Sequence, residues 1–396
     1  MISFKYLIEA ERSNADTANE QLAHLDHPYQ MHVLYGKNGA ESAIRDLKAT
    51  HEYFKTGKST KVTTSRKVDG GVSVIMKNHP TFGFSVSTKS AFNVNPKINY
   101  TEEDVDKNHG HAAGLAAALK HVLKHGKELV KPGHTVQGDL LYTNDEKKST
   151  PGDPKVTDEH VSSTPNRIEY KHSGKPKKFG IALHTEYEGN SAKSGVSSKA
   201  INPSRNVFIA DTSYEPKSSH YEQKHQDIAE KHLAAAEEIV KKNPVHFDIS
   251  KEHKEHLLTY MNSLRSEAGP LAPPTHEGYK EHLKRIMEKR QAAVKTEKSK
   301  AEKGAAFKNM IDEVDRDKPK FKSIFDFHDH INKVTEALTS TLHHNKPSNF
   351  TSHIDGAPST DEGIVVADKK TRNIRFKLVP NRIAAALKYN PRFARK

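Results

Sequence analysis

The spacing of apolar residues predicts a β-rich region in the first half of the chain. Apolar residues alternate with polar ones, or form short runs, in the expected strands 60–66, 72–77, 82–88, 135–142, 168–170, 179–184 and 207–210. We expect the first three strands to form a meander, and the last to complete the sheet. Apolar residues recur at helical spacing from 40 to 56, which predicts an amphipathic helix that covers the sheet and ends at Gly57. Asn38-Gly39 predicts a turn before that helix.

Two shorter helices are predicted between the third and fourth strands, one starting near residue 101 and one over 111–125. From 219 to about 345 the chain is charged, and its apolar residues recur every three or four positions. This pattern predicts four helices, over 220–242, 250–266, 276–315 and 323–342. The expected fold class is therefore α+β, with an all-α insertion at 219–345 that divides a core into 1–218 and 346–380. A basic tail follows at 381–396.

The composition narrows the classes of function. Lys and Arg number 63 against 50 Asp and Glu, a net charge of +13, which favours a polyanionic partner such as nucleic acid. The absence of cysteine excludes disulfides, thiol nucleophiles and cysteine-ligated zinc. No stretch has the length and hydrophobicity of a signal peptide or a membrane span, so we expect a soluble protein. The 26 histidines are scattered over polar helices, and we expect them to face solvent.

The stretch Lys67-Val68-Asp69-Gly70-Gly71 carries the strongest chemical signal, because it places a lysine and a tight turn between two predicted strands. A lysine amine attacks a phosphorus atom only when it is neutral, so its site needs nearby cations or burial to disfavour the ammonium form. The stretch resembles the nucleotide-attachment motif of the covalent nucleotidyltransferases, the superfamily of ATP-dependent DNA ligases, RNA ligases and mRNA capping enzymes.

Later stretches resemble the other motifs of this superfamily in the same order along the chain. They are Ser87-Thr88-Lys89-Ser90, the segment 135–142 around Asp139, the segment 179–187, Asp361-Glu362-Gly363 with its following apolar run, and Arg375-Phe376-Lys377. The resemblance implies a ligase-type adenylation domain of antiparallel sheets and flanking helices over the core. Only nineteen residues follow Lys377. We therefore expect no OB-fold domain, in contrast to DNA ligases and capping enzymes.

The resemblance also implies roles. Lys67 would form lysyl-AMP, with Asp69 and Lys377 as further catalytic residues, and Asp139 and Glu362 would bind Mg²⁺ or Mn²⁺. ATP would be contacted by cations and by a residue that stacks on the base. The candidates are Arg66, Lys89, Arg375 and Glu362 for the polar contacts, and Phe179, His184 or Tyr187 for the base.

Two positions depart from the ligase pattern. Val72 occupies a position where DNA ligases usually carry arginine, and Lys89 replaces an arginine that would bind phosphate through two hydrogen bonds. These departures favour an ATP-dependent polynucleotide ligase that acts on RNA rather than DNA. The alternatives are a nucleotidyltransferase with a protein or small-molecule acceptor, and a catalytically inactive structural or nucleic-acid-binding protein with the same fold.

Some stretches, such as Asn95-Pro96-Lys97 and Gln137-Gly138-Asp139, are similar to a group of uncharacterised proteins of large tailed phages. This similarity implies a location in the cytoplasm of the infected bacterium. Leu7-Ile8-Glu9-Ala10 resembles the cleavage sites of phage prohead proteases, which would imply packaging in the virion. ATP or GTP as the nucleotide, the acceptor and the oligomeric state stay open.

Overall fold

The computed structural model describes residues 25–386 except 69, 145–158, 162–167, 174–176, 190, 266–270 and 345–348. The longer helices are α3 (Pro28–Thr56), α4 (Glu102–His109), α5 (Ala113–His125), α6 (Gln223–Lys242), α7 (Lys251–Ser263), α8 (His276–Ala292), α9 (Glu297–Arg316), α10 (Lys318–Thr339) and α11 (Asn381–Ala386). The 3₁₀ turns are η1 (Lys89–Phe92), η2 (Ser218–His220), η3 (Pro244–Phe247) and η4 (Ser340–His344). None of these helices combines the length and the apolar content needed to cross a membrane.

In the described residues the strands form three sheets, and their strand pairings are antiparallel with one exception. They are β1 (Val62–Lys67), β2 (Ser73–His79), β3 (Gly83–Ser87), β4 (Thr135–Thr143), β5 (Glu159–Val161), β6 (Ile168–Ser173), β7 (Phe179–Glu188), β8 (Ser191–Ser194), β9 (Val207–Ile209), β10 (Thr351–Ile354), β11 (Ala357–Pro358), β12 (Gly363–Asp368) and β13 (Ile374–Leu378). The largest sheet has the order β3-β2-β4-β7-β8, and β9 pairs with β7 in parallel. The other two have the orders β11-β10-β6-β5 and β1-β12-β13. The predicted α+β class with antiparallel sheets is confirmed.

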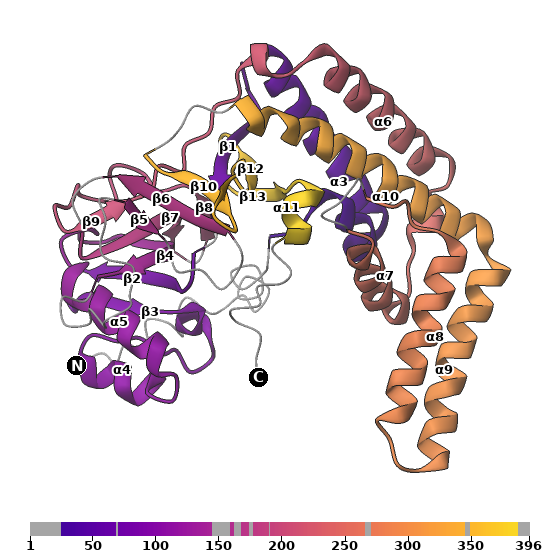
Figure 1. Cartoon of the computed structure of the whole chain (residues 1–396), viewed down its shortest axis with the longest axis horizontal. Helices are drawn as coiled ribbons and strands as arrows, with labels where there is room; N and C mark the ends of the chain where they lie inside the picture. Colours follow the sequence, from indigo (N-terminus) through magenta and orange to yellow (C-terminus); the bar gives the residue numbers. More distant parts are fainter. Residues whose placement is uncertain are drawn as a thin grey trace.

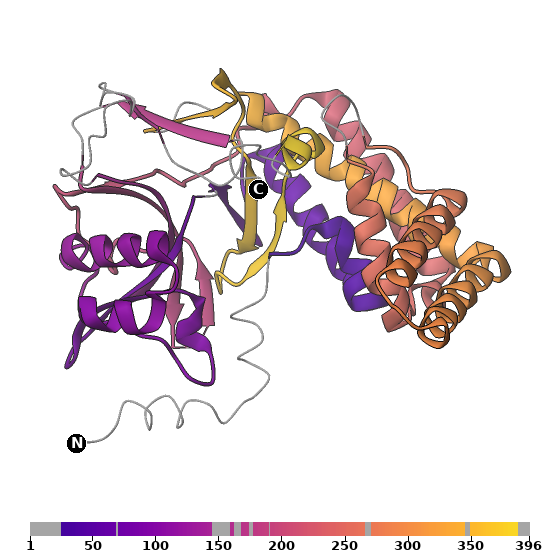
Figure 2. The ribbon, with the colours of Figure 1, turned by 60° about the horizontal axis from the view of Figure 1, so that its bottom comes forward.

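The molecule has a β-rich part and a helical part, with the small β1-β12-β13 sheet between them (Figure 1). Helices α4 and α5 cover one face of the large sheet, where Leu119 and Val122 join Val136 and Ile181 in one core. The opposite face of the large sheet packs on the β10-β6 sheet through residues that include Leu141 and Tyr170. Figure 2 shows helices α3 and α6 to α10 grouped on the other side of the molecule.

Helices α3, α6 and α10 cover one face of the β1-β12-β13 sheet. Ile364, Val366, Phe376 and Leu378 of that sheet share a core with Leu47 of α3 and with residues of the two other helices. Helix α3 therefore covers a sheet, as predicted, but it also packs along α6 and α10 as part of the helical region. The opposite face of the small sheet carries polar residues, which are described below.

Three predictions about elements are wrong. The first strand does not form a meander with the next two, because β1 pairs with β12, nearly 300 residues later. The expected helix over 276–315 is two antiparallel helices, α8 and α9, with Thr296 capping the second. Helix α3 begins at Pro28 and is broken at Gly36, where φ is 63°, rather than beginning after Asn38-Gly39. A side chain at Gly36 would meet the Phe247 carbonyl oxygen at 2.9 Å, so the break lets α3 pass close to η3.

Candidate functional site

Lys67 and Glu362 form a buried ion pair where β1 and β12 meet. Lys67 is the last residue of β1 and pairs with Gly363, so the residue before Gly363 lies beside the lysine. The Lys67 Nζ atom donates to Glu362 Oε1, and the side chains are 11% and 1% exposed. Tyr170 of β6 donates its hydroxyl to Glu362 Oε2 at 3.3 Å. Three strands that are distant in sequence thus contribute to one buried polar cluster.

A second ion pair fixes the same strand end. Arg66 donates through Nη1 to Asp361 Oδ2 at 2.6 Å and through Nε to the Ser213 carbonyl oxygen at 2.9 Å. Ser352 Oγ donates to the other carboxylate oxygen of Asp361 at 3.3 Å. Arg66, predicted to contact nucleotide, is thus engaged with Asp361 and Ser213. The Arg66–Asp361 and Lys67–Glu362 pairs together hold the end of β1 to the start of β12.

The loop after Lys67 lies directly on β4. Gly71 donates its N–H to the Leu140 carbonyl oxygen at 2.8 Å. A Cβ atom at Gly70 would lie 2.4 Å from that oxygen and 2.8 Å from Cβ of Asp139. Glycine is needed at position 70 because the two backbones touch there. This contact brings the Lys67 loop to Asp139.

Asp139 lies near Lys67 and is mostly buried. His184 of β7 approaches it, with 3.5 Å between His184 Nε2 and Asp139 Oδ1. Burial raises the pKa of Asp139, but hydrogen bonds from His184 and Ser73, with the charge of Lys67, outweigh burial and leave the pKa below its usual value. The carboxylate is therefore ionised at neutral pH. His184 also contacts Thr185 Oγ1 through Nδ1 at 2.8 Å.

Lys377 lies on the face of β13 away from Phe376 and Leu378, which are buried under the helices. Its backbone N–H donates to the Asp26 carbonyl oxygen at 3.0 Å, which brings His27 to this edge of the sheet. Burial, with the charges of Lys377, Arg265 and Lys67, holds the pKa of His27 well below its usual value. Lys377 and Lys67 therefore both lie close enough to His27 to repel a proton from it.

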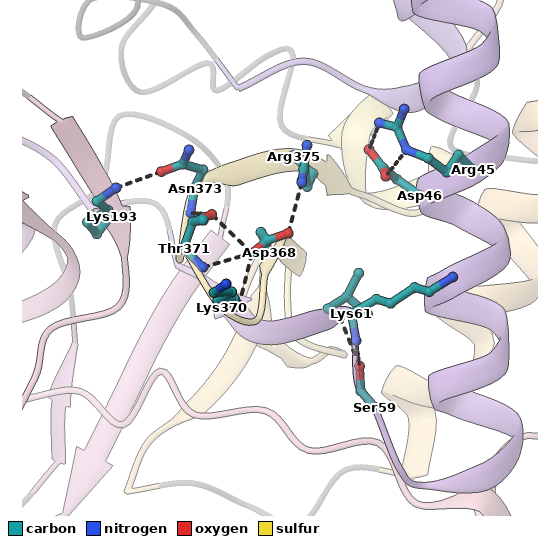
Figure 3. A network of polar contacts seen from close by, with 11 residues as sticks. Arg45, Asp46, Ser59, Lys61, Lys193, Asp368, Lys370, Thr371, Asn373 and Arg375 are labelled. Atoms are coloured by element: carbon teal, nitrogen blue, oxygen red, sulfur yellow. Dashed lines mark hydrogen bonds and ion pairs between the residues drawn. The ribbon is translucent and has the colours of Figure 1, made fainter.

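Arg375 is not at this site. Its Nη2 atom donates to Asp368 Oδ2 at 2.9 Å, in the turn between β12 and β13 (Figure 3). Asp368 lies at the opposite end of β12 from Gly363, and five residues of strand span about 16 Å. The structure thus separates Arg375 from Lys67, although it lies only two residues from Lys377.

Two of the three aromatic candidates for base stacking are buried elsewhere. Phe179 is fully buried in the core beneath α5, and Tyr187 is buried with its hydroxyl donating to Gln137. Neither ring is accessible to a base, so these predictions are wrong. His184 remains, with 32% of its side chain exposed beside Asp139.

Lys89 begins η1, directly after β3 and Thr88. Ser87 of β3 pairs with Ile75 of β2, and Ser73 of β2 pairs with Asp139. Lys89 therefore lies near the end of the large sheet that carries Asp139, about two strand spacings, or ~10 Å, away. Its half-buried ammonium group makes no hydrogen bond or ion pair with the described part of the chain.

The residues brought together are thus Lys67, Glu362, Asp139 and His184, with Lys377 nearby. Sequence reasoning missed three of their neighbours, which are Tyr170, Asp361 and His27. Asp361 stands next to Glu362 in a stretch already singled out, whereas Tyr170 and His27 carry no local signal. Asp69, the tail beyond 386 and the segment around Glu9 lie outside the described residues.

A hollow of about 790 Å³ lies away from this site, between α3, the end of α6 and the segment 58–61. Its lining includes Ile44, Lys48, Tyr53, Lys61 and Lys241. Lys61 directly precedes β1, at the other end of that strand from Lys67. The hollow therefore does not contain the Lys67–Glu362 cluster.

The fold and the site define an α+β protein with a buried lysine–glutamate pair where its small sheet meets the β-rich part. The chain belongs to a family of unknown function, DUF6267, whose model matches residues 19–387. Comparisons with curated proteins and with solved structures found no match.

The contact at Gly70 yields a first prediction. We expect Gly70→Ala to destabilise the protein by about 2 kcal/mol, because the added methyl group meets backbone atoms that cannot rotate away. Urea unfolding followed by circular dichroism measures the change. Gly114→Ala in α5 is the control, since a Cβ atom there meets nothing within 4 Å, and alanine stabilises a helix. Equal stability of Gly70→Ala and the native chain would contradict the close approach.

Proposed function

We propose that this protein is an ATP-dependent polynucleotide ligase, acting on RNA rather than DNA, with Lys67 as the residue that becomes adenylylated. The observation that carries the proposal is the contact of Lys67 with Glu362, 295 positions away in the chain. Asp139 lies against the loop that follows Lys67. Three of the stretches that resemble motifs of the nucleotidyltransferases therefore meet around one lysine.

In the first step, Lys67 Nζ attacks the α-phosphorus of ATP. A P–N bond forms, the bond from the α-phosphorus to the bridging oxygen breaks, and pyrophosphate leaves. The oxygen of a 5′-phosphate on nucleic acid then attacks the same phosphorus and frees the Lys67 amine. Attack of a 3′-hydroxyl on the activated 5′-phosphate seals the strand and releases AMP.

The site has features that suit the first step. Glu362 accepts a hydrogen bond from Lys67, so it orients the amine and would take the proton that the ammonium group must lose before it attacks, while the Tyr170 hydroxyl donates to the carboxylate from the other side. Lys377 adds a positive charge on the same face of the small sheet, where it would disfavour the ammonium form of Lys67 and attract phosphate. His184, partly exposed beside Asp139, would contact the base or the ribose.

Among the described residues, no three His, Asp or Glu side chains lie close enough to hold a metal ion by themselves. Asp139 and Glu362 nevertheless suit Mg²⁺ or Mn²⁺, because Mg²⁺ is usually held by one or two carboxylates together with substrate phosphates. When bound, such an ion would offset the charge that develops on the phosphate oxygens.

Covalent labelling of Lys67 tests the proposal. We expect the purified protein, incubated with Mg²⁺ and ATP labelled at the α-phosphate, to retain label on a denaturing gel. Lys67→Ala should retain none, because it lacks the amine that contacts Glu362. Lys58→Ala, in the exposed loop before β1, is the matched control and should retain full label. Parallel incubation with labelled GTP reports the base preference.

Absence of label with either nucleotide, from folded protein that mass spectrometry shows to be free of bound AMP, would overturn the proposal. It would favour an inactive protein that kept the fold. If Lys67 is labelled but neither 5′-phosphorylated RNA nor DNA removes the label, the acceptor is a protein or a small molecule and the ligase assignment fails.

A further inference from the structure

Helices α8 and α9 form an antiparallel hairpin, which we call the arm, that projects from the helical part of the molecule (Figure 1). Its base is anchored in a core that includes Tyr279, Leu283 and Val314. Further out, the ring of Phe307 packs against His256 of α7, and Arg290 lies over the same ring at 5.4 Å. These contacts attach the arm to the body of the molecule.

Charge is segregated along the arm. Its distal half, residues 284–308, contains nine Lys or Arg and three Glu. The basal residues, 276–283 and 309–316, contain two Lys or Arg and five Asp or Glu. Basal acids have partners, since Lys280 Nζ lies 2.7 Å from Asp315 Oδ1 and 3.2 Å from Glu277 Oε2. Beyond Lys284, whose charge acts on Asp315, the distal half instead carries five lysine ammonium groups with no ion pair or hydrogen bond to any described residue: Lys289, Lys295, Lys298, Lys303 and Lys308.

Helix stability does not explain this distribution. The helix dipole favours acids in the first turns and cations in the last turns. Helix α9 has the reverse, with Lys298, Lys300 and Lys303 near its start and Asp312, Glu313 and Asp315 near its end. Only Glu297 and Arg316 follow the dipole rule. The charge of α9 therefore changes from positive at the tip of the arm to negative near the body of the protein.

The side chains at the tip of the arm favour binding to phosphate groups over insertion into a lipid surface. A helix that inserts into a membrane interface exposes large apolar side chains beside its cations. The large apolar residues exposed in the described part of the chain, such as Phe82, Val94 and Val245, all lie outside the arm. Four of the five unpaired lysines lie on the two helices and Lys295 lies in the turn between them. From Lys298 to Lys308 they extend over about 15 Å of α9. Such an array neutralises successive backbone phosphates without reading bases.

We propose that the distal half of the arm binds the phosphate backbone of a nucleic acid and so docks the acceptor strand. This inference rests on the proposed function for its choice of nucleic acid as the polyanion. The binding is sequence-independent, depends steeply on salt, and does not require Lys67.

The experiment compares three full-length proteins: the native chain, an arm variant and a control variant. The arm variant replaces the five unpaired lysines of the distal half with Gln. The control variant replaces five exposed lysines on other elements with Gln: Lys124, Lys127, Lys199, Lys217 and Lys251. Both variants lose the same charge, so a difference between them reports position rather than net charge.

Fluorescence anisotropy with a labelled, 5′-phosphorylated 20-nucleotide RNA, and with DNA of the same sequence, measures affinity at several salt concentrations. We expect the arm variant to bind at least roughly 30-fold more weakly at low salt, and the slope of log K against log salt to fall by about 2 to 4. The control variant should change affinity by less than about 3-fold. Circular dichroism checks that each variant is folded. If the five-residue variant is unfolded, a variant with only Lys289, Lys295 and Lys298 replaced by Gln takes its place in the same measurement.

The outcomes separate this inference from the proposed function. If the arm variant still binds nucleic acid like the native chain, or if it and the control variant are weakened equally, the inference is overturned even when Lys67 takes label. If the native chain binds nucleic acid through the arm and Lys67 takes no label, the inference stands and the ligase assignment fails. Arm-dependent binding to anionic phosphatidylserine vesicles, without binding to RNA or DNA, would overturn it in favour of a membrane contact.

Discussion

Replacing Glu362 with leucine is expected to destabilise the protein by about 3 kcal/mol. The change leaves the Lys67 ammonium group, 11% exposed, without its partner and removes the acceptor of the Tyr170 hydroxyl. Removing one member of a buried ion pair costs this much because the other charge stays desolvated. Lys67→Met should cost a similar amount, since the Glu362 carboxylate is 1% exposed. Urea unfolding of both variants at pH 7.5 measures the effect.

The double variant, Lys67→Met with Glu362→Leu, should recover most of the lost stability, because neither charge then remains buried. The control is the exposed pair Lys37 and Glu41, whose side chains are 52% and 51% exposed. The same two substitutions there should show a coupling below about 1 kcal/mol. Additive losses at Lys67 and Glu362 would show that the two side chains do not interact in solution.

Mild acid is expected to destabilise the helical part of the protein through His32 of α3 and His328 of α10, which are both fully buried. Burial and the neighbouring His328 hold the pKa of His32 well below its usual value. Burial lowers the pKa of His328 to about 4. An unfolded histidine titrates near 6.5, so below that pH the unfolded chain binds more protons than the native chain. The stability of a fold that buries these two histidines in the neutral form is therefore fully present above pH 6.5 and is lost as the pH falls toward 4.

At pH 5, each of these two histidines should lower the free energy of unfolding by about 2 kcal/mol relative to its value at pH 7.5. Urea unfolding at both pH values measures the difference. His32→Leu removes one titrating group and should reduce the loss by about 2 kcal/mol, whereas His111→Leu, at an exposed position, should leave it unchanged. An identical pH dependence in the native chain and in His32→Leu would contradict the burial of a neutral imidazole at position 32.

The histidines also show a limit of sequence reasoning. Scattered over polar helices, they predict contact with solvent, but His253, His256 and His328 are buried. His253 contacts the Tyr279 hydroxyl through Nδ1 at 2.8 Å, and His328 contacts the Tyr29 carbonyl oxygen through Nδ1 at 2.9 Å. The charged face of each helix is visible in the sequence. The hydrogen-bond partner that allows a polar ring to enter the core comes from another helix, so the sequence of the first helix does not reveal it.

The hairpin of α8 and α9 was missed for a related reason. Helical spacing persists from 276 to 316, and no proline or glycine marks the turn at 293–296. The chain reverses because Leu283 and Phe307, 24 positions apart, bury their side chains in one core. A local pattern cannot tell a long helix from two helices that pack against each other.

The sequence by itself determined the α+β class, most strands of the β-rich part, and a lysine in a tight Gly-Gly turn at the end of a strand. These properties depend on residues that are neighbours along the chain. Only the tertiary structure decided which chemical groups meet, because pairing between β1 and β12 joins segments nearly 300 residues apart. The alternating pattern of Val62–Lys67 is the same whichever strand lies beside it. The fold therefore placed Glu362 and Tyr170 with Lys67, buried Phe179 in the core, and left Arg375 with Asp368 at the far end of the sheet.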